Sequence, residues 1–413
     1  MSARVYRRRD CRLCGSQDLD IVIPLAPTPV ADDFVPASRL DQPQEYFSLD
    51  AYLCRGCGLV QLLEVVDPAS IYDEFLYVTR SSPGLVEHFQ TYASDVIART
   101  RVDQGKFVVE VGSNDGTLLV FFQKQGFRVL GIDPARSIAE AATAEGIETL
   151  PLCFTESLAG QLARERGSAD LIAANNVVAN IDDLQEFGRS VRTLLAPDGV
   201  LVVESGYLAD LVRNLVFDNI YHEHLCYHSV KPLASFFQRH GMEVFDVQHV
   251  PTKGGSIRLF VQHQGASRAV SPRVAEAIHA EEAQGLYRPE TYQALCQTLD
   301  RLRHSLRDLL DGLSGLGRSI AGYGASHSVT TLLHHFGIAD RLSFVVDDNP
   351  LKHNLYSPGS HLPVLPSAAL LERRPDYVVV LPWRFAGAIA ARSQAFMQGG
   401  GRLIVPIPET RIL

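Results

Sequence analysis

The stretch that decides the fold is Glu110-Val-Gly-Ser-Asn-Asp-Gly116. It follows an apolar run, Phe107-Val-Val109, and precedes Thr117-Leu-Leu-Val-Phe-Phe122, which has helical character. Glycines at positions 112 and 116 let backbone amides come close to a ligand at the carboxyl edge of a sheet. A strand, a glycine turn and a helix in this order predict the first βαβ unit of a doubly wound α/β fold.

The same stretch predicts a bound nucleoside. The next strand, Arg128-Val-Leu-Gly-Ile-Asp133, ends in an acid about 20 residues on, where a carboxylate can bind a ribose hydroxyl. The spacing Gly-x-x-x-Gly differs from the Gly-x-Gly-x-x-Gly of dinucleotide enzymes, which favours a nucleoside without a pyrophosphate. We therefore predict S-adenosylmethionine as the cofactor, and a glycine-rich turn in another doubly wound sheet is the alternative. The predicted cofactor-binding residues are Glu110, Gly112, Asn114, Asp115, Gly116, Asp133, Asn175 and Asn176.

Three asparagines follow a later strand of the predicted sheet. Asn175 and Asn176 come directly after the apolar run Leu171–Ala174, at the edge where cofactor and substrate should meet. Their amides can bind the adenine or the substrate. Asn180 is a candidate hydrogen-bond donor to the substrate, and a capping role before Ile181-Asp182-Asp183 is its alternative.

Composition and net charge limit which class of protein this can be and which partners it can bind. The chain of 413 residues is long enough for two or three domains, and 46% hydrophobic with 21% charged residues is ordinary for a soluble globular protein. The net charge of −9 disfavours long nucleic acid or an anionic membrane as a partner. The first ten residues carry no apolar segment, and no stretch is long and apolar enough to span a bilayer. We expect a cytoplasmic protein of open oligomeric state, compatible with a monomer.

Four of the seven cysteines form two pairs, Cys11-Arg-Leu-Cys14-Gly15 and Cys54-Arg-Gly-Cys57-Gly58. A glycine after the second thiolate permits a left-handed turn, in which backbone amides can face the sulfurs. Two such turns supply four thiolates for one tetrahedral zinc, which leaves no position for water. We predict a structural zinc, and redox-active thiols are the alternative. The other three cysteines have no paired spacing and are expected to be small buried apolar residues.

Apolar runs that alternate with helical patterns predict a parallel sheet. The runs are Phe107–Val111, Val129–Ile132, Leu171–Ala174 and Gly199–Val203, and Glu243–His249 with Ser256–Val261 predicts an antiparallel edge. A second α/β unit begins at Arg318-Ser-Ile-Ala-Gly-Tyr-Gly-Ala-Ser326; it lacks the third glycine of a dinucleotide turn, so substrate binding or architecture is favoured over NAD. The expected parts are a zinc-binding module (1–75), a doubly wound domain (76–265), a helical linker (266–316) and a Rossmann-like domain (317–413).

The densest ionisable cluster is Tyr221-His222-Glu223-His224. An imidazole accepts a proton near neutral pH, and a nearby carboxylate can orient it. A tyrosine hydroxyl can bind a carbonyl or enolate oxygen. Metal binding is disfavoured because side chains at i and i+2 diverge, and a satisfied polar loop is the structural alternative.

Several blocks in order carry a family resemblance. They are the four-cysteine module, Tyr72…Tyr77…Ser81-Ser82, Glu110–Gly116, Tyr221–His224, Gly254-Gly-Ser-Ile-Arg258, Gly322-Tyr-Gly-Ala325, Val346-Asp-Asp-Asn-Pro350, Leu381-Pro-Trp383 and Pro406-Ile-Pro-Glu409. Over essentially its whole length the chain resembles the sugar C-methyltransferases that act on nucleotide-linked 4-keto-6-deoxysugars, of the tetronitrose-pathway C-3′-methyltransferase type. The resemblance implies a zinc-binding module, a methyltransferase domain and a Rossmann-like domain, with a sugar nucleotide, suggested to be a thymidine diphosphate, between the last two.

The resemblance also implies roles for single residues. The histidine that matches His224 is the base, and the residues that match Tyr77, Tyr221 and Glu223 line the substrate site. The chain departs from the family at Asn180, where a histidine is common, and at Ser326-His327-Ser328-Val329, where Gly-Ala-Pro-Ala-Lys-Gly is frequent. The predicted catalytic set is His224, Glu223, Tyr221, Tyr77, Asn180 and His222.

The predicted reaction is methyl transfer to a carbon beside the ketone of the sugar. His224 removes the proton with Glu223 orienting its ring, and Tyr221 and Asn180 stabilise the enolate oxygen. A keto-sugar nucleotide epimerase or isomerase, which uses the same enolate without methyl transfer, is the alternative. A sugar-nucleotide-binding protein without activity is a third hypothesis.

Overall fold

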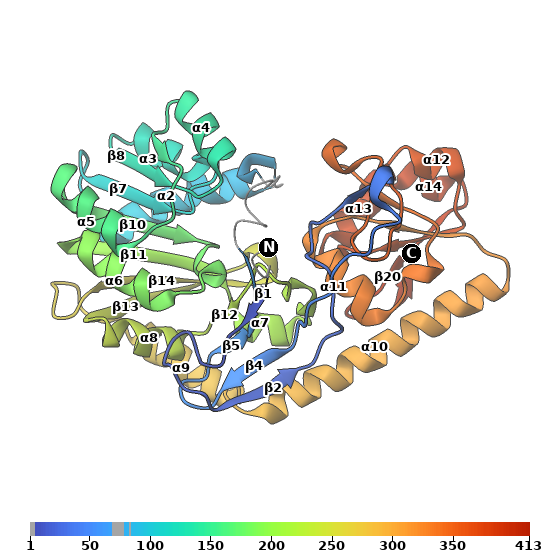
Figure 1. The fold of residues 1–413 in the computed structure, drawn as a ribbon, viewed down its shortest axis with the longest axis horizontal. Coiled ribbons are helices and arrows are strands. Elements are labelled where there is room, and N and C mark those ends of the chain that lie inside the picture. The colour runs from blue at the N-terminus through green and yellow to red at the C-terminus, as the bar shows by residue number, and fades with distance from the viewer. Residues whose placement is uncertain (1–4, 68–77, 82–83) are drawn as a thin grey trace.

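A seven-stranded sheet forms the centre of the computed structural model, which describes residues 5–67, 78–81 and 84–413 (Figure 1). Its strands lie in the order β13 (Met242–Val250), β14 (Ser256–His263), β11 (Leu195–Gly206), β10 (Ala169–Asn175), β7 (Phe107–Val111), β8 (Arg128–Ile132) and β9 (Thr149–Leu150). All neighbours are parallel except β14, which runs antiparallel to both β11 and β13. The predicted antiparallel pair is thus confirmed, with β14 inside the sheet and β13 at its edge.

Helices cover both faces of this sheet (Figure 1). One apolar cluster joins Val108 to side chains of the helices α2 (Leu85–Thr100) and α3 (Thr117–Lys124). Its neighbour Val109 belongs to a second cluster, because successive strand residues point to opposite faces. The helices of that second cluster are α5 (Glu156–Glu165), α6 (Leu184–Leu194) and α8 (Val230–Arg239). The helix α4 (Arg136–Ala144) follows β8. A doubly wound α/β domain is therefore confirmed.

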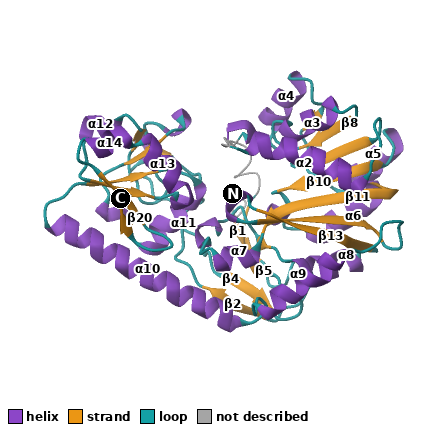
Figure 2. Ribbon diagram, turned by 180° about the vertical axis from the view of Figure 1, so that it is seen from behind, coloured by secondary structure: helices purple, strands orange, loops and turns teal. Residues whose placement is uncertain are grey.

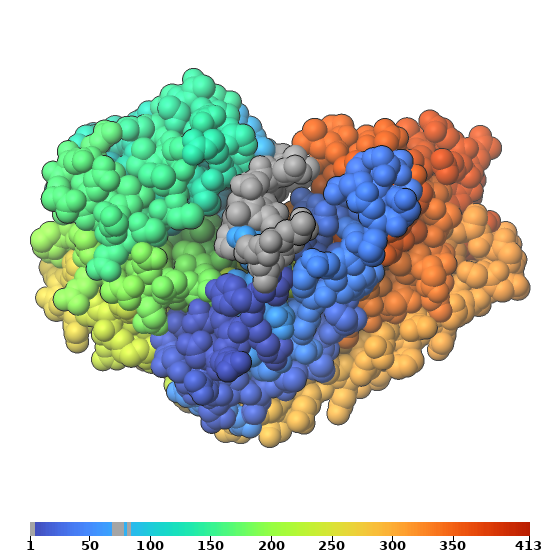
Figure 3. All heavy atoms as spheres, viewed as in Figure 1, coloured from blue at the N-terminus to red at the C-terminus, as the bar shows by residue number. Residues whose placement is uncertain are grey.

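The N-terminal module is joined by backbone hydrogen bonds to the two larger parts of the molecule. Its main sheet has the order β12 (Cys226–Tyr227), β5 (Val60–Leu62), β4 (Ala51–Cys54) and β2 (Leu19–Ile23), so its edge strand β12 comes from the central part of the chain. A smaller pair joins β1 (Val5–Arg7) to β6 (Glu64–Val66). On the other side, β3 (Val35–Pro36) pairs with β17 (Leu355–Tyr356) near the C-terminus. In Figure 3 these N-terminal residues, in blue, lie between the green and orange parts.

Two helices cross from the central sheet to the C-terminal part. They are α9 (Pro272–Ala283) and the long α10 (Pro289–Gly315), which runs along one side of the molecule in Figures 1 and 2. The buried face of α10 repeats leucine every three or four residues, at Leu295, Leu299, Leu302, Leu306, Leu310 and Leu313. Among the described helices, none has the length and apolar character that a membrane span requires.

The C-terminal part is a second α/β unit. Its sheet has the order β18 (Val364–Pro366), β16 (Val345–Asp347), β15 (Ile320–Tyr323), β19 (Tyr377–Val380), β20 (Arg402–Val405) and β21 (Arg411–Ile412). Only β21 is antiparallel to its neighbour. The helix α11 (His327–Phe336) begins just after the glycine turn, and α12 (Ala369–Arg373), α13 (Ala386–Arg392) and α14 (Gln394–Gln398) complete the unit. Gly324 has φ of +101°, and a Cβ there would lie 2.4 Å from Cδ of Pro382, so this tight turn requires glycine.

Candidate active site

The glycine turn after β7 has the shape of a ligand-binding loop. Gly112 and Gly116 have φ of +70° and +72°, in the left-handed region. A Cβ would lie 2.7 Å from a methyl carbon of Val177 at the first position and 2.8 Å from one of Ile147 at the second. Both positions therefore require glycine, and the loop keeps its backbone open at the carboxyl edge of the sheet.

Buried polar atoms surround this turn. In the described part of the chain, Oε2 of Glu110, Oγ of Ser113 and both amide atoms of Asn175 are buried without a hydrogen bond of ordinary geometry. Burial raises the pKa of Glu110 well above its usual value. Because buried polar groups are nearly always satisfied, these atoms are suited to bind a polar ligand. The residues present thus fit the adenosine and amino-acid groups of S-adenosylmethionine.

The remaining predicted cofactor residues lie around the same turn. The Asn114 amide donates to Oδ2 of Asp133 at 2.8 Å, which ties the acid after β8 to the glycine loop. Asp115 accepts the amide and Nε of Arg80, both at 3.0 Å, so it anchors the turn η2 (Thr79–Ser81) as well. Asn176 has φ of +55° and lines a cavity between the domains. These residues stay the proposed cofactor contacts.

The four paired cysteines form one cluster at the N-terminal module. Their sulfur atoms all lie within 4.8 Å of one another. Gly15 and Gly58 have φ of +73° and +86°, and their amides donate to the carbonyls of Cys11 and Cys54 at 2.8 Å. The predicted left-handed turns are therefore present in both knuckles. Four converging thiolates fit tetrahedral zinc, and a full set of protein ligands makes the metal structural.

A cavity of about 510 Å³ lies where the central sheet, the turn before β12 and the C-terminal unit meet. The sheet edge contributes Asn176 and the residues Ser205–Tyr207, and the C-terminal unit contributes the turn Ser326–Ser328. Tyr221 and His224 lie on the wall between them. The cavity thus brings the predicted cofactor edge and the predicted base to one space.

Hydrogen bonds define the tautomer of His224. Its Nδ1 lies 2.9 Å from the carbonyl oxygen of Asn219, in the short turn η4 (Phe217–Asn219), and a carbonyl can only accept. Nδ1 therefore carries hydrogen, and Nε2 of the neutral ring accepts the hydroxyl of Tyr221 at 3.0 Å. Burial lowers the pKa of His224 to about 4. At neutral pH the ring is therefore uncharged, and Nε2 is the nitrogen that can accept a proton.

The structure gives Glu223 and His222 other surroundings than the sequence predicts. In the described residues Glu223 does not bond to His224; its Oε1 lies 3.6 Å from Nε2 of His327, and the Asn219 carbonyl orients His224 instead. His222 is 1% exposed and packs edge-on against Phe47, and it is not among the described residues of the cavity wall, so its catalytic role stays a prediction. Neighbouring side chains in a tight turn point in different directions, which a sequence pattern cannot resolve.

Tyr77 and Asn180 complete the predicted catalytic set. Tyr77 lies outside the described residues. Asn180 ends the short turn η3 (Val178–Asn180) after β10, and its neighbour Ala179 lines the cavity. Asn180 therefore stays a proposed donor to the substrate.

A buried ion pair missed by the sequence reasoning fixes the turn that orients His224. Asp218, 1% exposed, accepts Nη1 of Arg384 at 2.6 Å and Nε1 of Trp383 at 3.2 Å. Arg384 also donates to the Asn219 side chain at 3.1 Å. Burial raises the pKa of Asp218, and Arg384 opposes the shift. The C-terminal unit thus holds the turn whose carbonyl binds His224.

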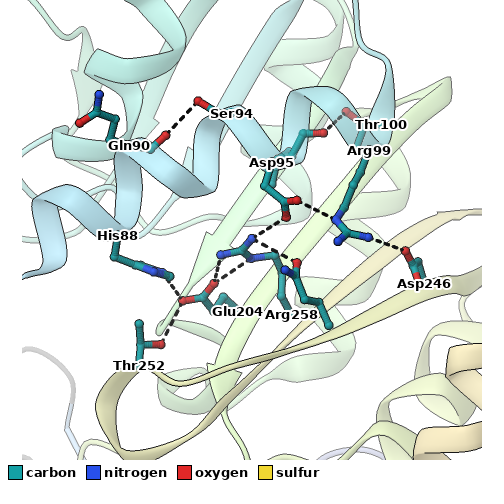
Figure 4. Close-up of polar contacts among 12 residues, drawn as sticks. His88, Gln90, Ser94, Asp95, Arg99, Thr100, Glu204, Asp246, Thr252 and Arg258 are labelled. Carbon is teal, nitrogen blue, oxygen red and sulfur yellow. Dashed lines mark hydrogen bonds and ion pairs between the residues drawn. The ribbon is translucent and has the colours of Figure 1, made fainter.

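A second unpredicted network lies at the end of β11 (Figure 4). Glu204 binds Nη2 of Arg258 at 2.7 Å and Nε2 of His88 at 2.7 Å, and Arg258 reaches Asp95 at 3.1 Å. Burial favours a higher pKa for Glu204, but His88 and Arg258 lower it overall. Because Oγ1 of Thr252 lies 3.5 Å from Glu204, the network joins α2, β11 and β14 to a turn that lines the cavity.

Comparisons with known proteins agree with this geometry. Three family models match the chain: "Putative zinc binding domain" at residues 11–72, "Methyltransferase domain" at 85–247 and "C-methyltransferase C-terminal domain" at 251–408. Together with the glycine turn and the cysteine cluster, they define an S-adenosylmethionine-dependent methyltransferase with a zinc-binding module.

One relative covers nearly the whole chain. C-methyltransferase NovU from Streptomyces niveus is 35% identical over 98% of this chain and 96% of its own length. The chain therefore belongs to the C-methyltransferase family, as the sequence resemblance predicts. A ubiquinone biosynthesis O-methyltransferase from Caulobacter sp. (strain K31) is 30% identical over 24% of this chain and 40% of its own.

Two solved methyltransferase structures are similar to part of the chain. An S-adenosylmethionine-dependent methyltransferase from Clostridium acetobutylicum is 13% identical, covers 48% of this chain and 98% of its own, and has a TM-score of 0.36. Magnesium protoporphyrin IX methyltransferase from Synechocystis, with bound S-adenosylhomocysteine, is 13% identical over 44% of this chain and 84% of its own, with a TM-score of 0.34.

Loss of zinc should destabilise the protein, because metal binding to this cluster contributes to the free energy of folding. We expect one zinc per chain by elemental analysis, and a lower urea midpoint after chelation or in Cys54→Ser. Cys153→Ser is the control, since Cys153 is exposed and outside the cluster. Full zinc content and stability in Cys54→Ser would contradict this assignment.

The buried His222 should make stability depend on pH. Burial lowers its pKa from 6.5 to about 4, so between these values the unfolded chain holds more protons. Stability from His222 is present at neutral pH and is lost as pH falls from 6.5 toward 4, by up to about 1.4 kcal/mol per pH unit. In His222→Gln, urea unfolding at several pH values should show a shallower loss toward acid than the wild type. His304→Gln, at an exposed position, serves as control; an unchanged slope in His222→Gln would refute the argument.

Proposed function

We propose that this C-methyltransferase methylates a carbon beside the ketone of a nucleotide-linked 4-keto-deoxysugar, with thymidine diphosphate as the nucleotide. The observation that carries the proposal is the tautomer of His224: Nδ1 is engaged by a backbone carbonyl, and Nε2 is an acceptor at a cavity wall. Such a group is suited to remove a weakly acidic C–H proton. The match to a C-methyltransferase supports carbon as the acceptor atom.

The cavity supports a substrate of the size of a sugar nucleotide. Its volume of about 510 Å³ lies within the range of about 300–1,000 Å³ typical of small-molecule sites. Lys253 is on its wall beside Arg384, whose guanidinium is paired with Asp218, and a cationic side chain favours a phosphate-bearing ligand. Phe385, which is 54% exposed, adds an aromatic surface on the same wall.

Proton removal is the step assigned to the chain itself. The C–H bond beside the ketone breaks, its electron pair forms the enolate, and the Tyr221–His224 pair gains one proton. Because the Tyr221 hydroxyl already donates to Nε2, we assign its oxygen as the relay: it passes its own proton to His224 and takes one from carbon. Asn180 is proposed as a hydrogen-bond donor to the enolate oxygen. Bound S-adenosylmethionine supplies the electrophilic methyl group that the enolate carbon takes up.

His224→Ala should lower turnover severely while S-adenosylmethionine still binds. Loss of a general base reduces the rate by about 10²–10⁴-fold. The assay incubates the enzyme with a panel of 4-keto-sugar nucleotides and S-adenosylmethionine, and mass spectrometry detects the added methyl group. Calorimetry measures cofactor binding by the variant.

His279→Ala, at an exposed position far along the chain, is the matched control and should keep full activity. Unchanged turnover in His224→Ala would remove His224 from the role of base. Products of unchanged mass but altered stereochemistry would favour the isomerase alternative.

A further inference from the structure

A second histidine enters the same cavity from the C-terminal unit. His327 is the first residue of α11 and lines the cavity together with Tyr221 and His224. Its ring stacks on that of Tyr221, with 5.6 Å between centroids and 27° between planes. The ring of His224 lies 4.1 Å from the same tyrosine. One phenol ring therefore contacts two imidazoles that come from different parts of the molecule.

The surroundings of His327 differ from those of His224. Nε2 of His327 lies 3.5 Å from Oδ2 of Asp32 and 3.6 Å from Oε1 of Glu223. In the described residues this nitrogen is buried and makes no hydrogen bond of ordinary geometry. Two carboxylate oxygens at this range attract an N–H group or a positive ring. Whereas His224 is arranged as an acceptor, His327 is arranged as a donor.

The titratable groups around His327 come from three parts of the chain. The turn before β12 contributes Tyr221, Glu223 and His224, and the N-terminal module contributes Asp32. Lys352, after β16, neutralises Asp32 through a bond of 2.8 Å from Nζ to Oδ1. Burial raises the pKa of Glu223. The site therefore does not present two uncompensated negative charges to the substrate.

The proposed reaction needs a donor that this arrangement can supply. An enolate places negative charge on the former ketone oxygen, and N–H donors aimed at that oxygen stabilise it. The hydroxyl proton of Tyr221 is engaged by Nε2 of His224, so this hydroxyl is not available to the oxygen at the same time. His327 stands beside Tyr221 on the cavity wall, within reach of the same part of a substrate.

We propose that His327 is a second catalytic residue: with Nε2 turned to Asp32 and Glu223, Nδ1 of its ring donates a hydrogen bond to the ketone oxygen of the substrate as that oxygen becomes an enolate. This inference rests on the proposed function. The Tyr221–His224 pair takes up the proton from carbon, the charge on oxygen is stabilised by His327, and the carbonyl re-forms when the new C–CH₃ bond is made. His327 exchanges no proton over the cycle.

Hydrogen exchange isolates the step that His327 serves. The wild type, with the active sugar nucleotide in D₂O and without a methyl donor, should exchange the hydrogen beside the ketone. In His327→Gln both this exchange rate and kcat should fall by about 10²–10³-fold, as on removal of one oxyanion donor. The Kd for S-adenosylmethionine and the melting temperature should stay unchanged, which shows that the variant is folded.

His334→Gln is the matched control, because His334 lies on the same helix but packs against Tyr46 away from the cavity; its exchange rate and kcat should equal those of the wild type. His327→Phe keeps an aromatic ring on Tyr221 and should be as slow as His327→Gln, whereas wild-type rates in it would reduce His327 to a stacking role and overturn the proposal. Exchange and kcat near wild type in His327→Gln, or a fall in kcat without a fall in exchange, would overturn it too. A wild type that neither exchanges nor methylates would overturn the proposed function itself.

Discussion

The ion pair between Asp218 and Arg384 is the constraint on which the candidate site depends. The carboxylate is fully buried, and Arg384 with Trp383 supplies its partners from the C-terminal unit. Loss of one partner of such a pair typically costs about 3–5 kcal/mol, because a charge is left buried and unpaired. The pair holds Asn219, whose carbonyl in turn fixes the tautomer of His224. The orientation of His224, the proposed base, is therefore set by the domain on the far side of the cavity.

The N-terminal module connects the central domain to the C-terminal unit through strand pairing with each of them. It extends its sheet with β12, which follows His224 by two residues, and pairs β3 with β17 of the C-terminal unit. The module also contributes Asp32, which lies 3.5 Å from Nε2 of His327. A structural zinc that keeps this small module folded thus acts at a distance on the substrate cavity, although the metal itself takes no part in the chemistry.

Local patterns predicted the fold, and contacts between distant segments made most of the site. The glycines at 112 and 116 and those at 15 and 58 were predictable because each serves a turn defined within a few residues. The pairs Asp218 with Arg384 and Glu204 with Arg258 could not be predicted, since their members are separated by 166 and 54 positions. Glu223 lies near His327 and not, as the sequence predicts, against His224. Residues in an irregular turn have no periodicity that fixes the direction of their side chains.

Departures from a family pattern are informative when the structure brings them to one place. Asn180 and His327 occupy positions where the sequence resemblance implies other residues, and an asparagine side chain cannot act as an acid or a base. Both positions belong to segments at the same cavity, where Ala179 and His327 are on the wall. The polar groups proposed for one step thus come from two different domains.

The most direct test of this account is a crystal structure with S-adenosylhomocysteine and an unreactive thymidine diphosphate 4-keto-sugar analogue. We expect the sugar carbon beside the ketone to lie between the Tyr221–His224 pair and the sulfur atom of S-adenosylhomocysteine. The distance from this carbon to the position of the transferred methyl should be about 3–3.5 Å, as in a near-attack geometry. A sugar bound away from His224, or a sulfur atom separated from it by protein side chains, would contradict the central claim.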